Sequence, residues 1–381
     1  MSAITLYEAL QAIPDHRTKK GRRFPLAAIL AISLAAMLSG ADSLMAIFRW
    51  GRRLSPKALQ ALGVDEKRKR APCHATYHYV FQSLSPEDLE AALGVLVDTQ
   101  DGLGHVAIDG KRLRSSQHET SPGVHMLHAF STKLQAAVGS LTVPPDSGEC
   151  IEALELIKKL PLDGSVVTGD AAFTMKSIVE AIRKQGGDYF LFVKGNQPEL
   201  KAELKRAFGD IPPQAVVAAE PLKVSERRDP PDLKRAETIE KGHGRIETRR
   251  IAVRTKLPSR LDQNWPGITA ICRIERHREM KDRCTRQVIY AITSLPPDKL
   301  AACDLLQLSR DHWQVENCLF HVRDVTFKED ASRVRSGSAP QVMAELRNAV
   351  LTLIRCSGQK PRPARESYAA RPRAAIKAIM N

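Results

Sequence analysis

The sequence predicts an α/β fold: a mixed β-sheet flanked by helices, with a helical domain before it and a β-rich insertion within it. Over residues 1 to 100, apolar residues recur three or four positions apart, which is the spacing of amphipathic helices. From about residue 104, strand-like and helix-like runs follow in the order β-β-β-α-β-α-β-α, which is typical of a mixed sheet with covering helices. Strand-like runs between about 210 and 300 interrupt this order. We therefore predict two domains, 1–100 and 101–356, with the insertion in the second.

The helices of the first domain begin at recognisable signals. Ser55 precedes Pro56 and Ser85 precedes Pro86, which pairs an N-cap residue with a proline at the first helical position. Residues 25 to 41 read PLAAILAISLAAMLSGA, an apolar run shorter than the roughly 20 residues that a membrane helix needs. We expect a buried core helix there, and no membrane partner.

The second domain opens with strand-like runs and then alternates helices with strands. In chain order, these runs are HVAID, HMLHAFST, AAVGSLTV, helical ECIEALELIKKL, SVVTGD, helical MKSIVEAIRKQ, YFLFVKGNQ and helical PELKAELKRAF. The insertion contributes the strand-like runs IETRRIAVRT, ITAICRIERHRE and TRQVIYAITS. Helical sequence resumes from Asp298 to about Phe327, and a last amphipathic helix is expected near 340–356. Residues 357–381 are basic and rich in proline and alanine, so we expect a disordered tail.

The composition favours a polyanionic partner. Among 381 residues, 58 Lys and Arg face 43 Asp and Glu, which gives a formal net charge of +15. Such an excess favours DNA or RNA, with an anionic membrane surface as the competing partner. The run Lys67 to Arg70 and the basic pairs at 19–20, 22–23 and 52–53 lie in the helical domain, either as a solvated face or as phosphate contacts.

The cysteines indicate a reducing compartment. The seven residues are odd in number, widely scattered and without a Cys-x-x-Cys pair. This pattern predicts free thiols in the cytoplasm and argues against a zinc site, so Asp, Glu and His would supply any metal ligands.

Three acidic residues are candidates for such a metal site. Asp109 ends the run HVAID and is followed by lysine and arginines, Asp170 ends the run SVVTGD, and Glu316 lies in the helical sequence SRDHWQVENCLF. Mg²⁺ prefers oxygen ligands, and two such ions roughly 3.5 to 4 Å apart stabilise the attacking and leaving oxygens of a phosphoryl displacement. The alternative is that the two aspartates merely cap strand ends and Glu316 is a solvated helix residue. We predict the metal site, because two of the acids end internal strands and cations follow the first.

Cationic and polar residues near these acids are candidate phosphate contacts. The candidates are Lys111, Arg112, Arg114, Lys194, Asn196, Gln197, His243, Arg245, Arg249, Arg250, His312 and Arg323. Residues 194–197 lie where a strand ends and a helix begins, a place where backbone N–H groups favour an anion. Arg323 follows Glu316 by seven positions and so would share its helix face. For His312 the competing interpretation is core packing beside Trp313.

The sequence resembles bacterial insertion-sequence transposases of the DDE superfamily, specifically the H-repeat-associated or ISAs-type group. Six ordered motifs carry the resemblance: IPDHR with GRRFPLAAIL, VAIDGK at 106–111, VVTGDA at 166–171, GGDYFLFVKGNQP at 186–198, HGRIETRR at 243–250 and HWQVEN at 312–317. The resemblance implies a ribonuclease H-like core, a helical DNA-binding or associated N-terminal domain, and Asp109, Asp170 and Glu316 as the acidic triad.

The resemblance also implies a reaction. A DDE transposase cuts DNA at the terminal repeats of its element and joins the free 3′-hydroxyl to target DNA with two Mg²⁺ or Mn²⁺ ions, and pairing of two ends suggests a homodimer. Two alternatives remain: a metal-dependent nuclease without strand transfer, and a DNA-binding protein that has lost catalysis. The sequence departs from the family pattern at Arg112, Ser115 and residues 319–321, which read Leu-Phe-His.

Overall fold

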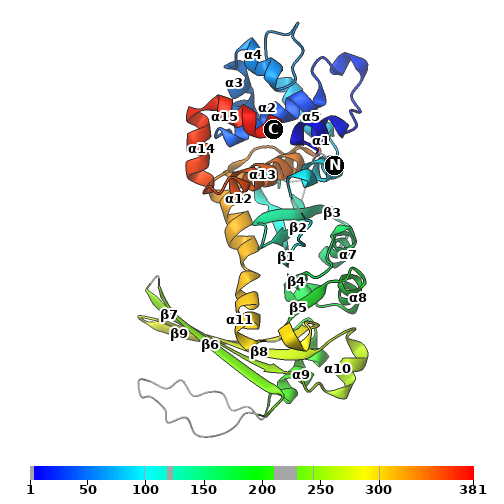
Figure 1. Ribbon diagram of the computed structural model, residues 1–381, viewed down its shortest axis with the longest axis vertical. Helices are drawn as coiled ribbons and strands as arrows, with labels where there is room; N and C mark the ends of the chain where they lie inside the picture. Colours follow the sequence, from blue (N-terminus) through cyan, green and yellow to red (C-terminus); the bar gives the residue numbers. More distant parts are fainter. Residues whose placement is uncertain (1–3, 98, 118–122, 210–229, 243, 300) are drawn as a thin grey trace. The chain divides into compact units, whose positions relative to one another are not determined.

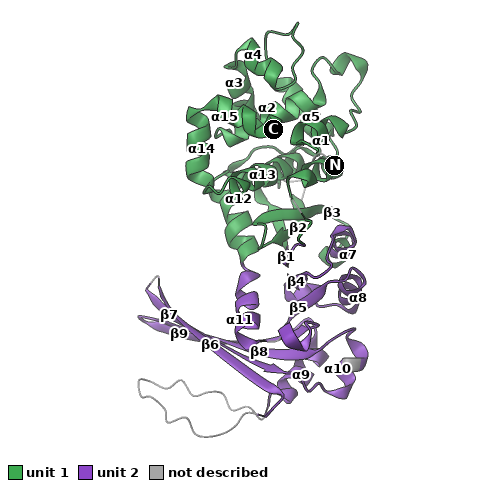
Figure 2. Cartoon of the chain, in the orientation of Figure 1, with its two compact units in different colours: residues 1–101, 109–152, 314–381 green, residues 102–108, 153–313 purple. Residues whose placement is uncertain are grey.

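The computed structural model describes residues 4–97, 99–117, 123–209, 230–242, 244–299 and 301–381. The chain forms two compact units, shown in different colours in Figure 2. The first unit comprises residues 1–101, 109–152 and 314–381, and the second comprises residues 102–108 and 153–313. The two predicted domains followed chain order, whereas these units are discontinuous because the chain passes between them within a strand and within helical segments.

Helices dominate the first unit. Their bounds are α1 Leu6–Ala12, α2 Leu26–Leu38, α3 Leu44–Arg52, α4 Pro56–Ala61, α5 His74–Ser83, α6 Pro86–Leu93, α12 His321–Val325, α13 Ala339–Cys356, α14 Pro361–Ala370 and α15 Pro372–Met380. Ser55 and Ser85 cap α4 and α6 as predicted, with each hydroxyl accepting from a backbone N–H. Helix α5 was not predicted, because its aromatic and histidine residues obscure the apolar spacing.

Helix α2 is the centre of the helical part of the first unit. Every residue from Leu26 to Leu38 is buried, as predicted for a core helix. The stretch Lys19–Leu38 has the length and mean hydropathy of a membrane span, but 72% of its apolar window is buried inside the protein. Helices α1, α3, α13, α14 and α15 pack against α2 (Figure 1). The apolar surface that could face lipid is therefore covered by the protein's own helices.

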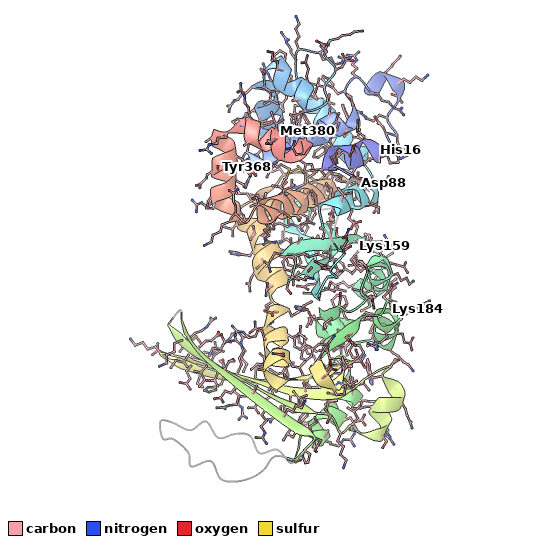
Figure 3. The ribbon with its side chains drawn as sticks, viewed as in Figure 1. His16, Asp88, Lys159, Lys184, Tyr368 and Met380 are labelled. Atoms are coloured by element: carbon pink, nitrogen blue, oxygen red, sulfur yellow. The ribbon has the colours of Figure 1, made fainter. Side chains whose placement is uncertain are left out.

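The prediction of a disordered tail over 357–381 is wrong. Helices α14 and α15 fill this segment, and Figure 3 labels Tyr368 and Met380 on them. Both begin with proline at an early helical position, and alanines supply helix propensity. Buried Ile376 and Ile379 anchor α15, while Arg365 of α14 donates to the carbonyls of Met37 and Ala41 at 3.2 Å. Proline at a helix start was mistaken for a sign of disorder.

The strands form one mixed sheet. Within the described residues, nine strands are hydrogen-bonded in the order β3-β2-β1-β4-β5-β9-β8-β7-β6. Their bounds are β1 His105–Leu113, β2 Val124–Ser131, β3 Ala136–Val143, β4 Val166–Gly169, β5 Asp188–Val193, β6 Leu233–Gly242, β7 Arg245–Arg254, β8 Ala270–Met280 and β9 Arg283–Thr293. Strands β1, β4 and β5 run parallel, and the pairs β2–β3, β5–β9, β9–β8, β8–β7 and β7–β6 are antiparallel. This order, with the predicted helices between the strands, is a ribonuclease H-like mixed sheet flanked by helices.

The helices associated with these strands are α7 Glu149–Lys159, α8 Lys176–Lys184, α9 Pro198–Ala207, α10 Ser259–Asn264 and α11 Ala302–Asp311. As predicted, α7 precedes the parallel strand β4, and α8 and α9 follow the parallel strands β4 and β5, whereas α10, between β7 and β8, was not predicted. The crossover helices lie between parallel strands because a parallel pair needs a connection of a dozen or more residues. Ile108 and Gly169 are register partners in the β1–β4 pair; β4 ends at Gly169, whereas β1 continues to Leu113.

The insertion extends the sheet rather than forming a separate layer. Strand β9 pairs with β5, and Phe190 lies opposite Thr293. The three predicted strands are β7, β8 and β9, but β6 was missed because LKRAETIEKG is almost entirely polar and exposed. An apolar cluster that includes Val253, Cys272 and Leu306 joins these strands to α11. Residues 210–229, the first part of the insertion predicted over about 210–300, lie outside the described residues.

Candidate active site

Asp109 and Asp170 each come one residue after the last register pair of two neighbouring parallel strands. Asp109 follows Ile108, and its Oδ1 accepts a hydrogen bond from the N–H of Gly110 at 2.8 Å. Asp170 follows Gly169, and its Oδ1 accepts from the N–H of Ala171 at 2.7 Å. Asp170 directly follows the end of β4, as predicted, whereas Asp109 lies within β1, which continues to Leu113, so the prediction that Asp109 ends its strand is wrong. Asp109 belongs to the first unit and Asp170 to the second.

Gly110 is required by close packing. A Cβ at this position would lie 2.7 Å from Nε2 of His125 and 3.0 Å from a carboxylate oxygen of Glu149. Those two side chains pair at 3.0 Å. The glycine of the IDGK motif therefore makes room for a His–Glu pair directly beside Asp109, and sequence inspection did not identify this pair.

In the second unit, Asp170 is held by a cation. Lys194 Nζ lies 2.6 Å from its Oδ1, and the carboxylate is 48% exposed. Burial raises the pKa of Asp170, but hydrogen bonds from Lys194 and Ala171 and the lysine charge outweigh it, so the net pKa is lowered. Asp170 is therefore ionised at neutral pH and already faces a positive charge.

The polar residues that follow β5 connect to the turn after Asp170. The amide of Asn196 donates to the carbonyl of Ala171 at 2.6 Å, and the amide of Gln197 donates to the carbonyl of Thr174 at 2.9 Å. Both residues were predicted to contact phosphates. In the structure their side-chain donors instead hold the strand–helix loop against the turn, which positions Lys194 and Asp170.

His312 belongs to a buried polar chain in the second unit. Its Nδ1 lies 3.0 Å from the hydroxyl of Thr168, which lies 2.7 Å from Nε2 of His105. Burial lowers the pKa of His312 to about 4, and that of His105 to about 3. The prediction of a phosphate contact at His312 is therefore wrong, because a buried neutral imidazole attracts no anion. The competing interpretation, core packing, is confirmed by its ring contacts with Phe192 and Trp313.

Glu316 lies on a groove of the first unit. It is exposed on a π-helical turn, Val315–Phe320, a rare element that occurs frequently at functional sites. The groove has a volume of about 550 Å³ and is lined by Gly110, Lys111, Arg112, Leu113, Arg114, Gln117, Glu316, Phe320, Asp324 and Asp330. Three predicted phosphate contacts thus line the same groove as the predicted catalytic glutamate.

The three cations of the groove differ in their exposure to solvent and in their ion pairing. Lys111 pairs with Asp324 at 2.7 Å, is 10% exposed and lies over the ring of Phe320. Arg112 is exposed, and Arg114 is 83% exposed, with Asp330 4.0 Å away. Two solvent-exposed guanidinium groups and one paired ammonium therefore line the groove. Of the departures from the family pattern, Arg112 and Phe320 line the groove, whereas Leu319 is buried and His321 is exposed outside it.

The prediction that Arg323 contacts phosphate is wrong. Its side chain is fully buried and pairs with Glu329 at 2.9 Å, and it also lies within hydrogen-bonding distance of His128 and Asn348. The prediction assumed regular α-helical spacing after Glu316, but the intervening π-turn has i→i+5 hydrogen bonds and rotates later residues. Arg323 faces the interior of the first unit, where it neutralises Glu329.

The basic residues of β7 are all engaged in ion pairs. Arg245 and Arg249 lie near Glu247, and Arg250 pairs with Glu237 on the opposite strand. His243, the first residue of this predicted group, lies outside the described residues.

Comparison with known proteins identifies the family. Residues 7–97 match the family described as DDE_Tnp_1-associated, and residues 100–353 match the transposase DDE domain. The second match covers more than half of the chain. The chain belongs to the DDE transposase family.

Relatives of this DDE transposase are found in Escherichia coli strain K12. The H repeat-associated protein YhhI, named as a transposase, is 30% identical over 92% of this chain and 90% of its own length. A second H repeat-associated protein, YbfD, is 32% identical over 64% of this chain and 91% of its own length. A solved piggyBac transposase synaptic complex with hairpin DNA is 10% identical, with a TM-score of 0.45, and the match covers 99% of this chain and 77% of that one.

DDE transposases use divalent metal ions, and the donor chemistry of this chain suits such ions. Asp109, Asp170 and Glu316 offer the oxygen ligands that Mg²⁺ and Mn²⁺ prefer. The ammonium of Lys194 already stands beside Asp170 as a metal cation would. Within the described parts of the chain, however, no three His, Cys, Asp or Glu side chains are grouped closely enough to hold an ion.

Proposed function

We propose that this transposase cleaves DNA at the ends of its element and transfers the strand into target DNA, with Asp109, Asp170 and Glu316 as the catalytic carboxylates. The observation that carries the proposal is the register of β1 and β4, in which Ile108 and Gly169 are partners and an aspartate follows each. Glu316 is assigned to the same site because it lies in the family motif HWQVEN and because cations line its groove. The helical domain over 1–100 would assist in binding DNA.

The three carboxylates would hold two Mg²⁺ or Mn²⁺ ions together with phosphate oxygens of the bound DNA. When bound, such ions lower the pKa of water and stabilise the attacking and leaving oxygens of an in-line displacement. Because phosphates supply part of the coordination, the absence of a ready three-residue cluster among the described side chains is compatible with assembly on DNA. Lys194 would remain beside Asp170 as an outer partner that orients its carboxylate toward an ion.

The cations of the groove would position the DNA strand. Arg112 and Arg114 carry exposed guanidinium groups, which bind phosphates through two parallel hydrogen bonds. Lys111 is held by Asp324, so it would add to the positive electrostatic potential of the groove without contacting a phosphate directly. The resident side chains thus orient a phosphodiester beside Glu316 and neutralise its charge.

The partners are the terminal repeats and target DNA in double-stranded form. Two ends must be held together for strand transfer, so we propose a homodimer in the DNA complex. The seven cysteines that the structure describes are all free, which agrees with a reducing cytoplasmic environment.

The test is cleavage and strand transfer on DNA carrying the element's own terminal repeats, with Mg²⁺ or Mn²⁺. Wild-type protein should cut and join, whereas Asp109→Asn and Glu316→Gln should bind DNA and form neither product. Cleavage without joined product would identify a metal-dependent nuclease. Binding without any cleavage by the wild type would identify a DNA-binding protein that has lost catalysis.

A further inference from the structure

Five arginines and two glutamates form a connected ion-pair network in the outer part of the second unit. We name it the arginine cluster; its members are Arg245, Arg249, Arg276, Arg278, Arg310, Glu240 and Glu247. Strands β6, β7 and β8 supply six of the residues, and α11 supplies Arg310. Figure 1 shows these strands as a long antiparallel ribbon with α11 beside them.

The strand register places the cluster on one face of the ribbon. Glu247 lies opposite Arg278 and Arg249 lies opposite Arg276 in the β7–β8 pair. Glu240 lies opposite Glu247 in the β6–β7 pair. Residues two apart on a strand share a face, so all of these side chains project to the same side.

A nearly buried carboxylate organises the cluster. The side chain of Glu247 is 5% exposed, and Arg249 and Arg278 approach it at 2.9 and 3.1 Å. Arg276 also pairs with it, and Arg245 lies 3.7 Å away. One negative charge thus holds four guanidinium groups in fixed positions, which reduces the entropy lost when those groups meet a ligand.

The cluster has more positive charge than its carboxylates can neutralise. Glu240 pairs with Arg249 at 3.2 Å and Arg310 at 2.6 Å, so five arginines share two glutamates, a surplus of three positive charges. The guanidinium groups remain accessible: Arg245 is 41% exposed, Arg278 34% and Arg310 30%. A purely structural network would be expected to balance its charges.

The opposite face of the same ribbon shows such a near balance. Arg250 pairs with Glu237, and Glu275 pairs with Arg273 at 2.6 Å and Arg286 at 2.8 Å. Three arginines there share two glutamates. The sequence grouped Arg250 with Arg245 and Arg249, but the strand alternation puts it on this other face.

We infer that the arginine cluster is a binding surface for the phosphate backbone of duplex DNA. A preorganised array of arginines with surplus positive charge matches regularly spaced phosphates, and it reads no base sequence. The inference rests on the proposed function for its ligand, and it assigns Arg276, Arg278 and Arg310 to DNA binding in addition to the two arginines of β7. This surface would hold DNA independently of the carboxylate chemistry.

The test compares two double variants that remove equal charge from the two faces. Arg245→Gln with Arg278→Gln weakens the cluster but leaves Arg249 and Arg276 on Glu247, and Arg250→Gln with Arg286→Gln is the matched control, which leaves Arg273 on Glu275. Binding of the full chain to a mixed-sequence DNA duplex is measured by fluorescence anisotropy over a range of salt concentrations. Circular dichroism and thermal unfolding check that each variant is folded. If the double variant of the arginine cluster does not fold, the single variant Arg245→Gln replaces it in the binding measurement.

The first double variant should reduce the slope of log Kd against log salt concentration by about 2, since each phosphate contact contributes about 0.9. The control should change the slope by less than half as much. Equal slopes for both double variants, or an unchanged slope for the cluster variant, would overturn the inference. Failure of the wild-type chain to bind DNA would instead overturn the proposed function, whereas binding without cleavage leaves the surface supported.

Discussion

Arg323 in the first unit and Arg245 in the second were both predicted to hold phosphates, and the structure gives them opposite environments. Arg323 is fully buried and neutralised by Glu329, which also pairs with Arg347 at 3.0 Å. Arg245 is 41% exposed and belongs to a cluster with surplus positive charge. An ion pair alone therefore does not decide the role of an arginine. Burial and local charge balance do.

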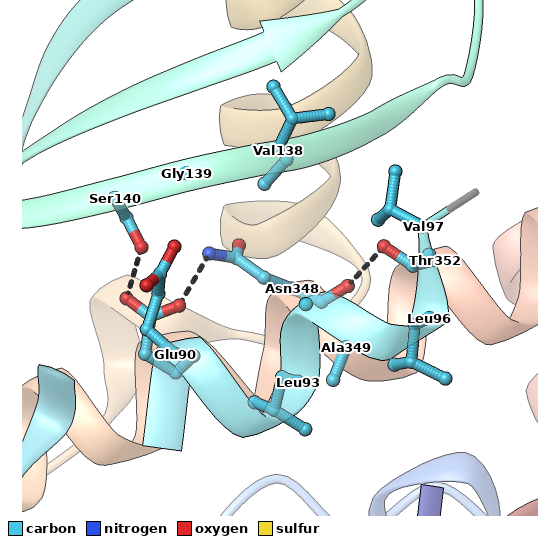
Figure 4. Close-up of a pocket in the computed structure, with 13 residues that line it drawn as sticks. Glu90, Leu93, Leu96, Val97, Val138, Gly139, Ser140, Asn348, Ala349 and Thr352 are labelled. Carbon is cyan, nitrogen blue, oxygen red and sulfur yellow. Dashed lines mark hydrogen bonds between the residues drawn. The ribbon is translucent and has the colours of Figure 1, made fainter. Parts of the chain in front are cut away.

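The buried carboxylates of the first unit show the same dependence on neighbours. Burial raises the pKa of Glu329, but Arg323 and Arg347 outweigh it, so the net pKa is lowered. Glu345 accepts hydrogen bonds from Ser140 at 2.6 Å and Asn348 at 3.3 Å, and burial raises its pKa to about 7. Figure 4 shows the small pocket beside it, where nearby Glu90 adds to the increase in the pKa.

The largest effect on stability is expected from substitution of Arg323. Arg323→Gln should lower the free energy of unfolding by about 3 to 5 kcal/mol, because it leaves a buried carboxylate with half of its countercharge. Urea-induced unfolding measures this. Arg245→Gln is the control and should change stability by no more than about 0.5 kcal/mol, as expected for an exposed site. Equal stability of the two variants would refute the assignment of Arg323 to the interior.

The raised pKa of Glu345 predicts a loss of stability as the pH rises from about 4.5 to about 7. Its neutral form is favoured in the folded state, so its contribution is full below its ordinary pKa of 4.5 and is lost as pH rises to about 7. Glu345→Gln should remove this decline, which amounts to roughly 3 kcal/mol. Unfolding is measured in urea at about pH 5 and about pH 8. Exposed Glu366→Gln is the control, and an unchanged pH dependence in the Glu345 variant would contradict the raised pKa.

The lowered pKa of His312, in the second unit, predicts the opposite trend, a loss of stability as the pH falls. Because burial lowers its pKa to about 4, stability is present above the ordinary value of 6.5 and is lost as pH falls toward 4. His312→Asn should reduce this acid-side loss by about 3 kcal/mol, with His105 accounting for part of the remainder. The measurement is the thermal midpoint across that range. Exposed His16→Asn should leave the curve unchanged, and an equal flattening in both variants would rule out the assignment.

The sequence predicted the parts of the fold that depend on local patterns. Ser85 before Pro86 marked a helix start, and the runs ending at Asp109 and Asp170 marked two internal strands that proved to be neighbours. Strand β6 was missed because it carries little apolar alternation, and the last two helices were missed because the prolines at their starts were mistaken for a sign of disorder.

The candidate site was predicted only where the chain itself carries the signal. The acidic residues that follow apolar runs and the cations after Asp109 are visible in the sequence, although β1 continues beyond Asp109. The burial of Arg323, by contrast, depends on a π-turn and on Glu329, Asn348 and His128 from other elements. The arginine cluster likewise depends on strand register. Residues that are distant in sequence meet only through tertiary pairing, which no local pattern encodes.

The central claim is that Asp109, Asp170 and Glu316 perform metal-dependent phosphodiester chemistry. The most direct test measures the joined product of strand transfer with Mn²⁺ for the wild type, Asp170→Asn and Lys194→Gln. If Asp170 is a catalytic carboxylate, Asp170→Asn should bind DNA like the wild type and form no joined product. Lys194→Gln keeps the carboxylate and should lose about 10- to 100-fold in rate, as outer partners of metal ligands do. Joined product from Asp170→Asn at the wild-type level would contradict the account.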